Sequence, residues 1–306
     1  MMFNIAGKRL WFFLIAGVVI LVSIISLATF GLKAGIEFSS GSMMTVGFEQ
    51  KVDRGELKQE LASLGYSNAI VQGIGKDESL IRLPQLSGKA KTELEAGLTA
   101  QLGALEVREF DVVSPMIATE TTRNAAIAVA IAAIGILLYI TWAFHRMPNP
   151  FRYGTCAIIA LVHDALVVLG VFSILSGILD WEINLMFITG MLAVIGYSVN
   201  NTVVVFDRIR ENLRMGVSLD FEVVVNNSLV ETLSRSLNTS LTTLFVVLAL
   251  LFFVGASIQN FAVVLLIGII AGTYSSLFIA PHLLVAWEKG GWSRLLQWLL
   301  LPRAKA

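Results

Sequence analysis

A few polar residues interrupt the long apolar runs of this sequence, and these residues could carry charge or protons. Asp164 follows His163 in the middle of one apolar segment, and two adjacent amides, Asn200 and Asn201, interrupt another. An ionisable side chain at the centre of a bilayer costs roughly 2.5–3.5 kcal/mol on insertion scales, so it normally faces protein or water and indicates function. Two interpretations of Asp164 stay open: a hydrogen bond between helices, or an acid that takes part in transport.

Charged residues follow the two amides along the chain. Helical spacing places Gly196, Asn200 and Asp207 on one face of a helix. Arg235 begins the next apolar segment, where it either reaches a carboxylate or amide of the preceding segment or extends to the membrane surface. Amides in membrane helices commonly join helices, each contributing about 0.6–2 kcal/mol. Proton coupling is therefore one hypothesis, and helix adhesion with an interfacial charged anchor is the other.

The sequence has no motif typical of a catalytic or metal centre. His145, His163 and His282 lack metal-ligand spacing, and no G-x-x-x-x-G-K-[ST] motif for ATP occurs. The single cysteine, Cys156, cannot form an internal disulfide. The formal net charge is zero, which gives no reason to expect a nucleic-acid partner. We expect a protein that is not an enzyme, holds no cofactor or metal, and draws its energy from elsewhere.

Membrane spans are the elements that must position these polar residues. Of the 306 residues 56% are hydrophobic and 14% are charged, whereas soluble domains have about 25% charged residues. A bilayer core about 30 Å thick needs roughly 20 apolar helical residues. Six segments are long enough: 10–30, 124–144, 154–176, 183–206, 236–254 and 260–287. The last one carries Gly268, Gly272 and Ser276 at four-residue spacing, which is typical of close helix packing.

Basic residues near the ends of the spans predict the orientation of the chain. With the N-terminus in the cytoplasm, the lysines and arginines of the short loops and of the C-terminal tail fall inside. The short outer loops then carry Asp180 and Glu182 and no basic residue. Both termini are therefore expected in the cytoplasm, and the long loop 32–123 is expected outside.

The long loop is expected to form an α+β domain. Its β-rich runs and helical patterns follow one another in the order βαββαβ, which is the ferredoxin-like pattern. Asp53 and Ser87 are expected to cap its two helices, and residues 75–78 to form a hairpin turn. Such a sheet leaves one face open for a partner; a generic α+β spacer is the alternative. The chain thus divides into a first segment and span (1–31), an external domain (32–123), spans two to six (124–290) and a cytoplasmic tail (291–306).

Several strings resemble a known family. The stretch GYSVNNTVVVFDRIREN at 196–212 resembles the fourth-span signature of SecF, a subunit of the bacterial SecDF protein-export complex, usually written G-Y-S-[LVI]-N-D-[ST]-[IV]-V-V-F-D-R-I-R-E-N. Other resemblances follow in the family's order: GIEFSSG at 35–41, VSP at 113–115, HD at 163–164, LSRSLNTS at 233–240 and IGIIAGTYSS at 267–276. Together they extend over nearly the whole chain.

The resemblance implies an α-helical membrane protein with six transmembrane helices, similar to one half of a proton-driven RND-type transporter. A SecD-like subunit would supply the other half, beside the SecYEG channel in the bacterial cytoplasmic (inner) membrane. The pair would use the proton motive force to help exported unfolded polypeptides across, with membrane lipid around it. Gly35, Gly41 and Pro115 are expected to act as hinges. Two alternatives stay open: a structural half-subunit that carries no protons, and an RND-type exporter of lipids or small molecules.

Asn201 is the main departure from the family pattern. The family usually has Asp at this position, which is thought to carry a proton, with the arginine that matches Arg235 as its counter-ion. An amide is nearly isosteric with a protonated carboxyl group but cannot ionise. We therefore expect Asn201 to hold the geometry of the protonated state, while an acid of the partner, helped by Asp164, titrates.

Overall fold

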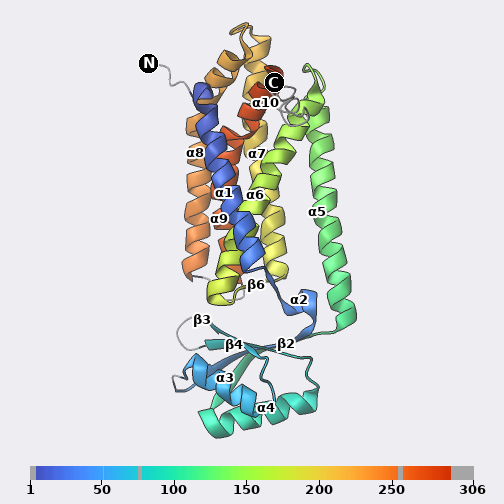
Figure 1. Ribbon diagram of the computed structural model, residues 1–306, viewed down its shortest axis with the longest axis vertical. Coiled ribbons are helices and arrows are strands. Elements are labelled where there is room, and N and C mark those ends of the chain that lie inside the picture. The colour runs from blue at the N-terminus through green and yellow to red at the C-terminus, as the bar shows by residue number, and fades with distance from the viewer. Residues whose placement is uncertain (1–4, 51, 75–77, 254–257, 291–306) are drawn as a thin grey trace, which may run out of the picture.

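The computed structural model describes residues 5–50, 52–74, 78–253 and 258–290. A bundle of long helices forms one part, and an α+β unit lies beyond one end of the bundle (Figure 1). In the described part of the chain, six helical segments are long and apolar enough to cross a membrane. The six-span architecture predicted from the apolar runs is therefore confirmed.

The described bundle consists of seven helices. They are α1 (Arg9–Thr29), α5 (Pro115–Ala143), α6 (Pro150–Leu179), α7 (Leu185–Arg214), α8 (Phe221–Phe253), α9 (Gln259–Phe278) and α10 (Ala280–Glu288). Four of them, α5 to α8, are longer than the predicted spans. Helix α7 does not end near Phe206, and Arg235 lies well inside α8 rather than at its beginning. The added turns bury residues such as Ile209 and Leu229 on one side only. A search for uniformly apolar runs misses such amphipathic extensions.

The α+β unit has the predicted βαββαβ order, and we call it the external unit after its predicted position. Its elements are β2 (Gly41–Phe48), α3 (Arg54–Ser63), β3 (Ile70–Ile74), β4 (Glu78–Leu83), α4 (Gly88–Leu102) and β5 (Leu105–Val113). The antiparallel sheet has the order β3-β4-β2-β5. The Asp53 side chain accepts a hydrogen bond from Gly55 N at 2.8 Å, and Ser87 from Ala90 N at 3.3 Å, so both predicted helix caps are present. Turn residues 75–77 and tail residues 291–306 lie outside the described residues.

The sheet lies between its two helices and the bundle (Figure 1). Alternate strand residues, including Met44, Val46 and Ile81, are buried against leucines of α3 and α4. Because successive strand side chains point to opposite faces, the other face of the sheet is directed toward the outer end of the bundle. The face that was expected to be open for a partner therefore looks toward this chain's own membrane helices.

Three short elements join the external unit to the bundle, and the sequence did not predict them. They are β1 (Lys33–Ala34), α2 (Ile36–Ser39) and β6 (Glu182–Ile183). Strands β1 and β6 pair in parallel, although they are about 150 residues apart in the sequence. A two-residue strand shows no periodicity, which is why these elements were missed. On the other side of the unit, β5 and α5 are separated only by Ser114.

Candidate functional site

Asp164 lies inside the bundle, where three helices meet, and its side chain is only 1% exposed. Its Oδ2 accepts hydrogen bonds from Ser198 Oγ of α7 at 2.6 Å and from Ser275 Oγ of α9 at 2.8 Å. Its Oδ1 lies 3.1 Å from Nδ1 of His163. This last contact can form with the proton on either the carboxyl group or the imidazole. The group therefore joins α6, α7 and α9 and has the chemistry to exchange a proton.

His163 provides the only other ionisable side chain that contacts Asp164 among the described residues. It is 5% exposed, and its Nε2 is buried without a hydrogen-bond partner in the described part of the chain. Its ring stacks on Tyr274 at 6.2 Å between centroids. An unpaired buried nitrogen costs about 1–3 kcal/mol. Such an atom is unusual in a purely structural core and is consistent with a role in proton exchange.

Close packing of α9 on α7 brings the two serines to the buried carboxylate. A Cβ atom at Gly268 would lie 2.1 Å from Val194 Cγ2, and one at Gly272 would lie 2.9 Å from Ser198 Cβ. Ser276, the third residue of the predicted stripe, is fully buried. Only glycine allows the two backbones to approach so closely at these two positions.

A second group of polar side chains links α7, α8 and α9 through hydrogen bonds. The hydroxyl of Tyr197 donates to Ser240 Oγ at 3.1 Å, and Ser240 Oγ lies 2.7 Å from Thr273 Oγ1. Asn201 lies one turn after Tyr197, and it is 3% exposed. Its Nδ2 and the hydroxyl of Ser236 are buried without a hydrogen-bond partner in the described residues. Asn201 therefore lies within the protein, but its amide nitrogen does not join two helices there.

Other predicted residues lie on the outside of the bundle. Asn200 and Arg235 are exposed, as are Asn238 and Thr242 of α8. We call these four residues the exposed polar set. Within the described ranges Arg235 forms no ion pair, so the contact with α7, which is one of its two expected alternatives, is not made among these residues. Polar side chains in hydrocarbon normally face protein or water, so this set is a candidate surface for contact with either.

Asp207 belongs to a charged network that joins α7 to α8 at the end of the bundle far from the α+β unit (Figure 1). It forms an ion pair with Arg210, one turn further along α7. Arg208 Nε lies 2.6 Å from Glu231 Oε2 of α8, and Asn212 Nδ2 donates to the same oxygen at 2.9 Å. These contacts fasten the two helix ends together, which favours the interpretation of this segment as an anchor.

The three predicted hinge residues lie where the external unit joins the bundle. Gly35 N donates to Ile183 O at 2.8 Å, and a Cβ atom there would lie 3.1 Å from that oxygen. Gly41 begins β2 with φ +134°, and a Cβ atom would lie 2.7 Å from Leu83 O. Pro115 is the first residue of α5. Both glycines are thus required by close backbone approach, and Gly41 also by its backbone conformation.

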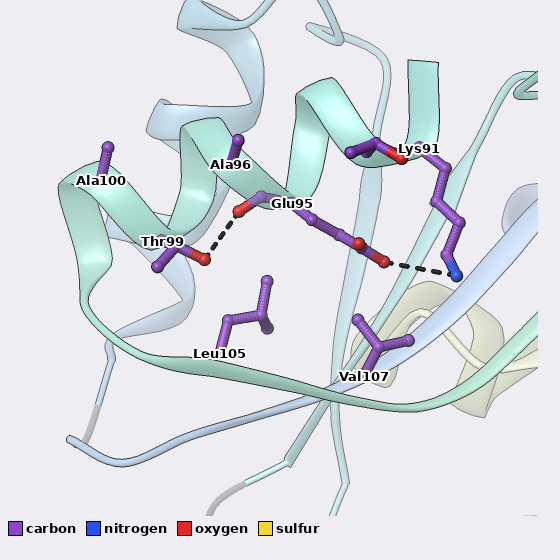
Figure 2. A pocket seen from close by; sticks show the side chains of 8 residues that line it. Lys91, Glu95, Ala96, Thr99, Ala100, Leu105 and Val107 are labelled. Atoms are coloured by element: carbon purple, nitrogen blue, oxygen red, sulfur yellow. Dashed lines mark hydrogen bonds and ion pairs between the residues drawn. The ribbon is translucent and has the colours of Figure 1, made fainter. Parts of the chain in front are cut away.

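A separate depression of about 800 Å³ lies on the external unit between α4 and β5 (Figure 2). Its lining includes Lys91, whose Nζ lies 3.4 Å from Glu95 Oε1, and the apolar side chains of Leu105 and Val107. An ion pair within one helix and two apolar side chains provide no reactive group. The polar residues of the bundle therefore remain the candidate site.

Sequence reasoning missed the two serines that hold Asp164. Ser198 and Ser275 both lie in strings that resemble the SecF family, but nothing in their spacing relates them to a residue of α6. A small hydroxyl residue in an apolar helix is common and is not distinctive by itself. Only the packing of three helices brings these residues together.

Comparison with known proteins gives consistent matches along the chain. Residues 94–290 match the family described as protein export membrane protein SecD/SecF, C-terminal, and residues 25–52 match the SecD/SecF GG motif. The chain is 42% identical to the protein translocase subunit SecF of Thermobaculum terrenum, with 96% of each chain covered. It is 35% identical to the protein translocase subunit SecDF of Bacillus subtilis, covering 93% of this chain and 38% of that protein.

Solved structures give the same result for the fold. The crystal structure of SecDF from Thermus thermophilus superposes with a TM-score of 0.85 at 33% identity, covering 94% of this chain and 39% of that one. A structure of SecDF in a super-membrane-facing form gives a TM-score of 0.66 at 31% identity, covering 97% of this chain and 40% of that one. The chain thus spans about two-fifths of the SecDF chains that it matches.

Proposed function

Because the chain belongs to the SecD/SecF family of protein export membrane proteins, we propose that it forms the SecF-type half of a proton-driven export unit. It is a multi-pass inner-membrane protein that assists protein export with a SecD partner. It matches a SecF relative over 96% of that protein and a SecDF relative over 38% of that protein. A separate SecD-like subunit would supply the remaining part.

The observation that carries the proposal is the position of Arg235. Arginine side chains carry a positive charge, and within the described residues Arg235 has no counter-ion. It lies on α8, next to the helix that carries Asn200 and Asn201. An acid on the matching helix of a SecD-like subunit would neutralise Arg235 and complete a proton site between the two chains. Asn201 would then maintain the geometry, and the partner would supply the titrating group.

Proton transfer would act on the packing of the bundle. Loss or gain of charge at Asp164 changes the strength of its hydrogen bonds with Ser198 and Ser275, because hydrogen bonds to charged groups are stronger. Helices α7 and α9 would then shift against α6, and the external unit would swing on segments 32–41 and 112–123. One proton that crosses 100 mV supplies about 2.3 kcal/mol, so several cycles would be needed for each exported segment.

The remaining partners and the orientation are part of the same proposal. Both termini would lie in the cytoplasm and residues 32–123 outside, as the basic residues of the short loops indicate. The external unit would then act on unfolded polypeptides that emerge from a SecYEG channel. The exposed apolar side chains of α1 and α5 would contact lipid.

Export by the complete complex tests the proposal. The chain and its SecD-like partner are reconstituted in vesicles with the channel, and export is measured with and without a proton motive force. Arg235→Ala should reduce the part of export that depends on the proton motive force, here called force-dependent export, while the complex still assembles. Arg108→Ala is a matched control, because Arg108 lies on the external strand β5 and pairs with Glu78. Unchanged export with Arg235→Ala would count heavily against the proposal.

One alternative has support from specific observations. Asn201 cannot ionise, and both oxygens of Asp164 already have partners, as expected of a subunit that only stabilises its partner. The double variant Asp164→Asn/Arg235→Gln separates the two functions. Export that is unaffected in this variant would favour the structural subunit, whereas loss of the force-dependent part would favour proton coupling.

A further inference from the structure

Arg82 lies on the face of the external sheet that is directed toward the bundle. Its neighbours on β4, Ile81 and Leu83, are buried against the helices of the external unit. Alternation along the strand therefore directs the Arg82 side chain to the opposite face. Strand β4 belongs to the β3–β4 hairpin, and its chain neighbours on both sides are elements of the external unit. Any link between β4 and the bundle must therefore be made by side chains.

One guanidinium group makes this link. Arg82 Nη1 donates to Glu182 Oε1 of β6 at 2.6 Å and to Ala34 O of β1 at 2.6 Å, and its Nη2 donates to Ser39 Oγ of α2. The Arg82 and Glu182 side chains are 18% and 13% exposed, so solvent screens the ion pair weakly. The planar fork of arginine suits several acceptors at once, which an ammonium group serves less well.

The elements that Arg82 contacts are themselves fastened to the bundle. Gly35 N donates to Ile183 O at 2.8 Å, and Lys33 N donates to Ser176 Oγ of α6 at 3.2 Å. Asn260 Nδ2, in the first turn of α9, donates to the backbone oxygen of Glu182 at 3.0 Å. Glu182 therefore lies in the α6–α7 connection, which is held against α6 and α9 by these hydrogen bonds and leads directly into α7.

The same three helices meet at Asp164. The distance along α6 from Asp164 to its outer end at Leu179 is about 22 Å, from fifteen residues at 1.5 Å each. Helices are stiff over this length, so a shift in packing at Asp164 would move the α6–α7 connection that carries Glu182. The guanidinium contacts would pass such a movement to β4, independently of the two covalent connections of the external unit.

We propose that Arg82 is a positioning residue for export: it docks the external sheet on the α6–α7 connection through Glu182, so that the external unit follows movements of the membrane helices. The inference rests on the proposed function, because it requires that the bundle moves during export. Docking itself can be measured without export, which keeps the two claims separable.

The distance between the external unit and the bundle provides the direct test. In the full chain with its SecD-like partner in vesicles, Cys156→Ala removes the natural thiol, and spin labels are attached through Lys58→Cys on α3 and Ile178→Cys on α6. Both positions are exposed. Pulsed electron paramagnetic resonance should give one narrow distance distribution. Arg82→Gln should raise the ratio of undocked to docked molecules about tenfold or more, equivalent to about 1.4 kcal/mol, and should lower force-dependent export.

Two comparisons exclude a general disturbance of the sheet. Arg108→Gln removes an arginine of the same sheet whose partner, Glu78, lies 2.6 Å away within the external unit, and it should leave the distribution narrow. Glu182→Gln lies outside the sheet and cannot unfold it, yet it should also broaden the distribution. The double variant Arg82→Gln/Glu182→Gln should be no worse than Arg82→Gln alone, because the two residues act as a pair.

The outcomes separate this inference from the proposed function. A narrow distribution in Arg82→Gln and Glu182→Gln, additive effects in the double variant, or equal broadening by Arg108→Gln would each overturn the docking role. Docking can depend on Arg82 while export by the wild-type complex does not depend on the proton motive force. That result would instead overturn the proposed function. Normal docking and export in Arg82→Gln would overturn only this inference.

Discussion

Replacing Asp164 by asparagine separates its two interpretations, because the amide keeps the shape of the side chain and removes its charge. In the structure, one carboxylate oxygen accepts from Ser198 and Ser275, and the other contacts His163. The amide oxygen of Asp164→Asn can accept both serine hydroxyls in the same way. The variant therefore preserves most of the packing but cannot exchange a proton.

The cost in stability can be worked out from these contacts. Hydrogen bonds to charged groups contribute about 1.5–3 kcal/mol and neutral ones about 0.5–1.5 kcal/mol, so two weakened bonds cost about 2–3 kcal/mol if the carboxyl is ionised. The cost is near zero if the carboxyl is already protonated. Hydrogen bonds between membrane helices average about 0.6 kcal/mol each, so on that scale even the complete loss of both bonds would cost only about 1 kcal/mol. A loss of this size leaves the bundle folded.

Export by reconstituted complexes, measured with and without a proton motive force, is the assay. Asp164→Asn should assemble with its partner and lose the force-dependent part of export. Ser173→Ala is a matched control on the same helix, because it removes a buried hydrogen bond of 2.8 Å to Ser26 O and no ionisable group. It should retain force-dependent export. Full force-dependent export by Asp164→Asn would refute the transport role and leave Asp164 as a structural link.

Three further predictions concern the amide, the packing stripe and the docking site. Asn201→Asp should leave or improve proton coupling in the export assay, and complete loss of export would show that the amide has a positive role. Gly268→Ala should lower the stability of the bundle by about 1–3 kcal/mol in detergent unfolding, because its Cβ overlaps Val194, whereas Gly135→Ala has open space and should not. Equal stabilities would contradict the close helix contact. Glu182→Gln should lower the docked fraction of the external unit in the distance measurement, because it removes the carboxylate that Arg82 contacts; an unchanged docked fraction would contradict this.

The local features of the fold could be predicted from the sequence. Apolar runs of about 20 residues identify membrane helices because lipid requires every backbone group to be paired within the segment. The βαββαβ order followed from strand-like runs and from caps such as Asp53 and Ser87, whose hydrogen bonds reach only two or three residues along the chain. Such interactions join residues that are close in the sequence, so a local sequence pattern is enough to predict them.

The contacts that complete the site could not be predicted in this way. Asn200 and Asn201 are adjacent, yet the first is exposed and the second is buried, because neighbouring helical residues point about 100° apart. The apolar pattern alone did not show which of the two faces the interior. Arg82 and Glu182 are 100 residues apart and belong to different parts of the molecule. Their pairing depends on how the external unit meets the bundle, which no local pattern encodes.

Proton coupling across two subunits requires that the partner lies against the exposed polar set, and cross-linking tests this position directly. Asn200→Cys in a Cys156→Ala background is combined with single cysteines along the matching helix of the SecD-like subunit, and disulfide formation is followed in native membranes. Ile131→Cys on α5 serves as the control, since Ile131 is 64% exposed on an apolar helix face. A cross-linked product with the combined mass of both subunits is expected from position 200, and none is expected from position 131. An assembled complex that gives no product from position 200 with any partner cysteine would contradict this position of the partner.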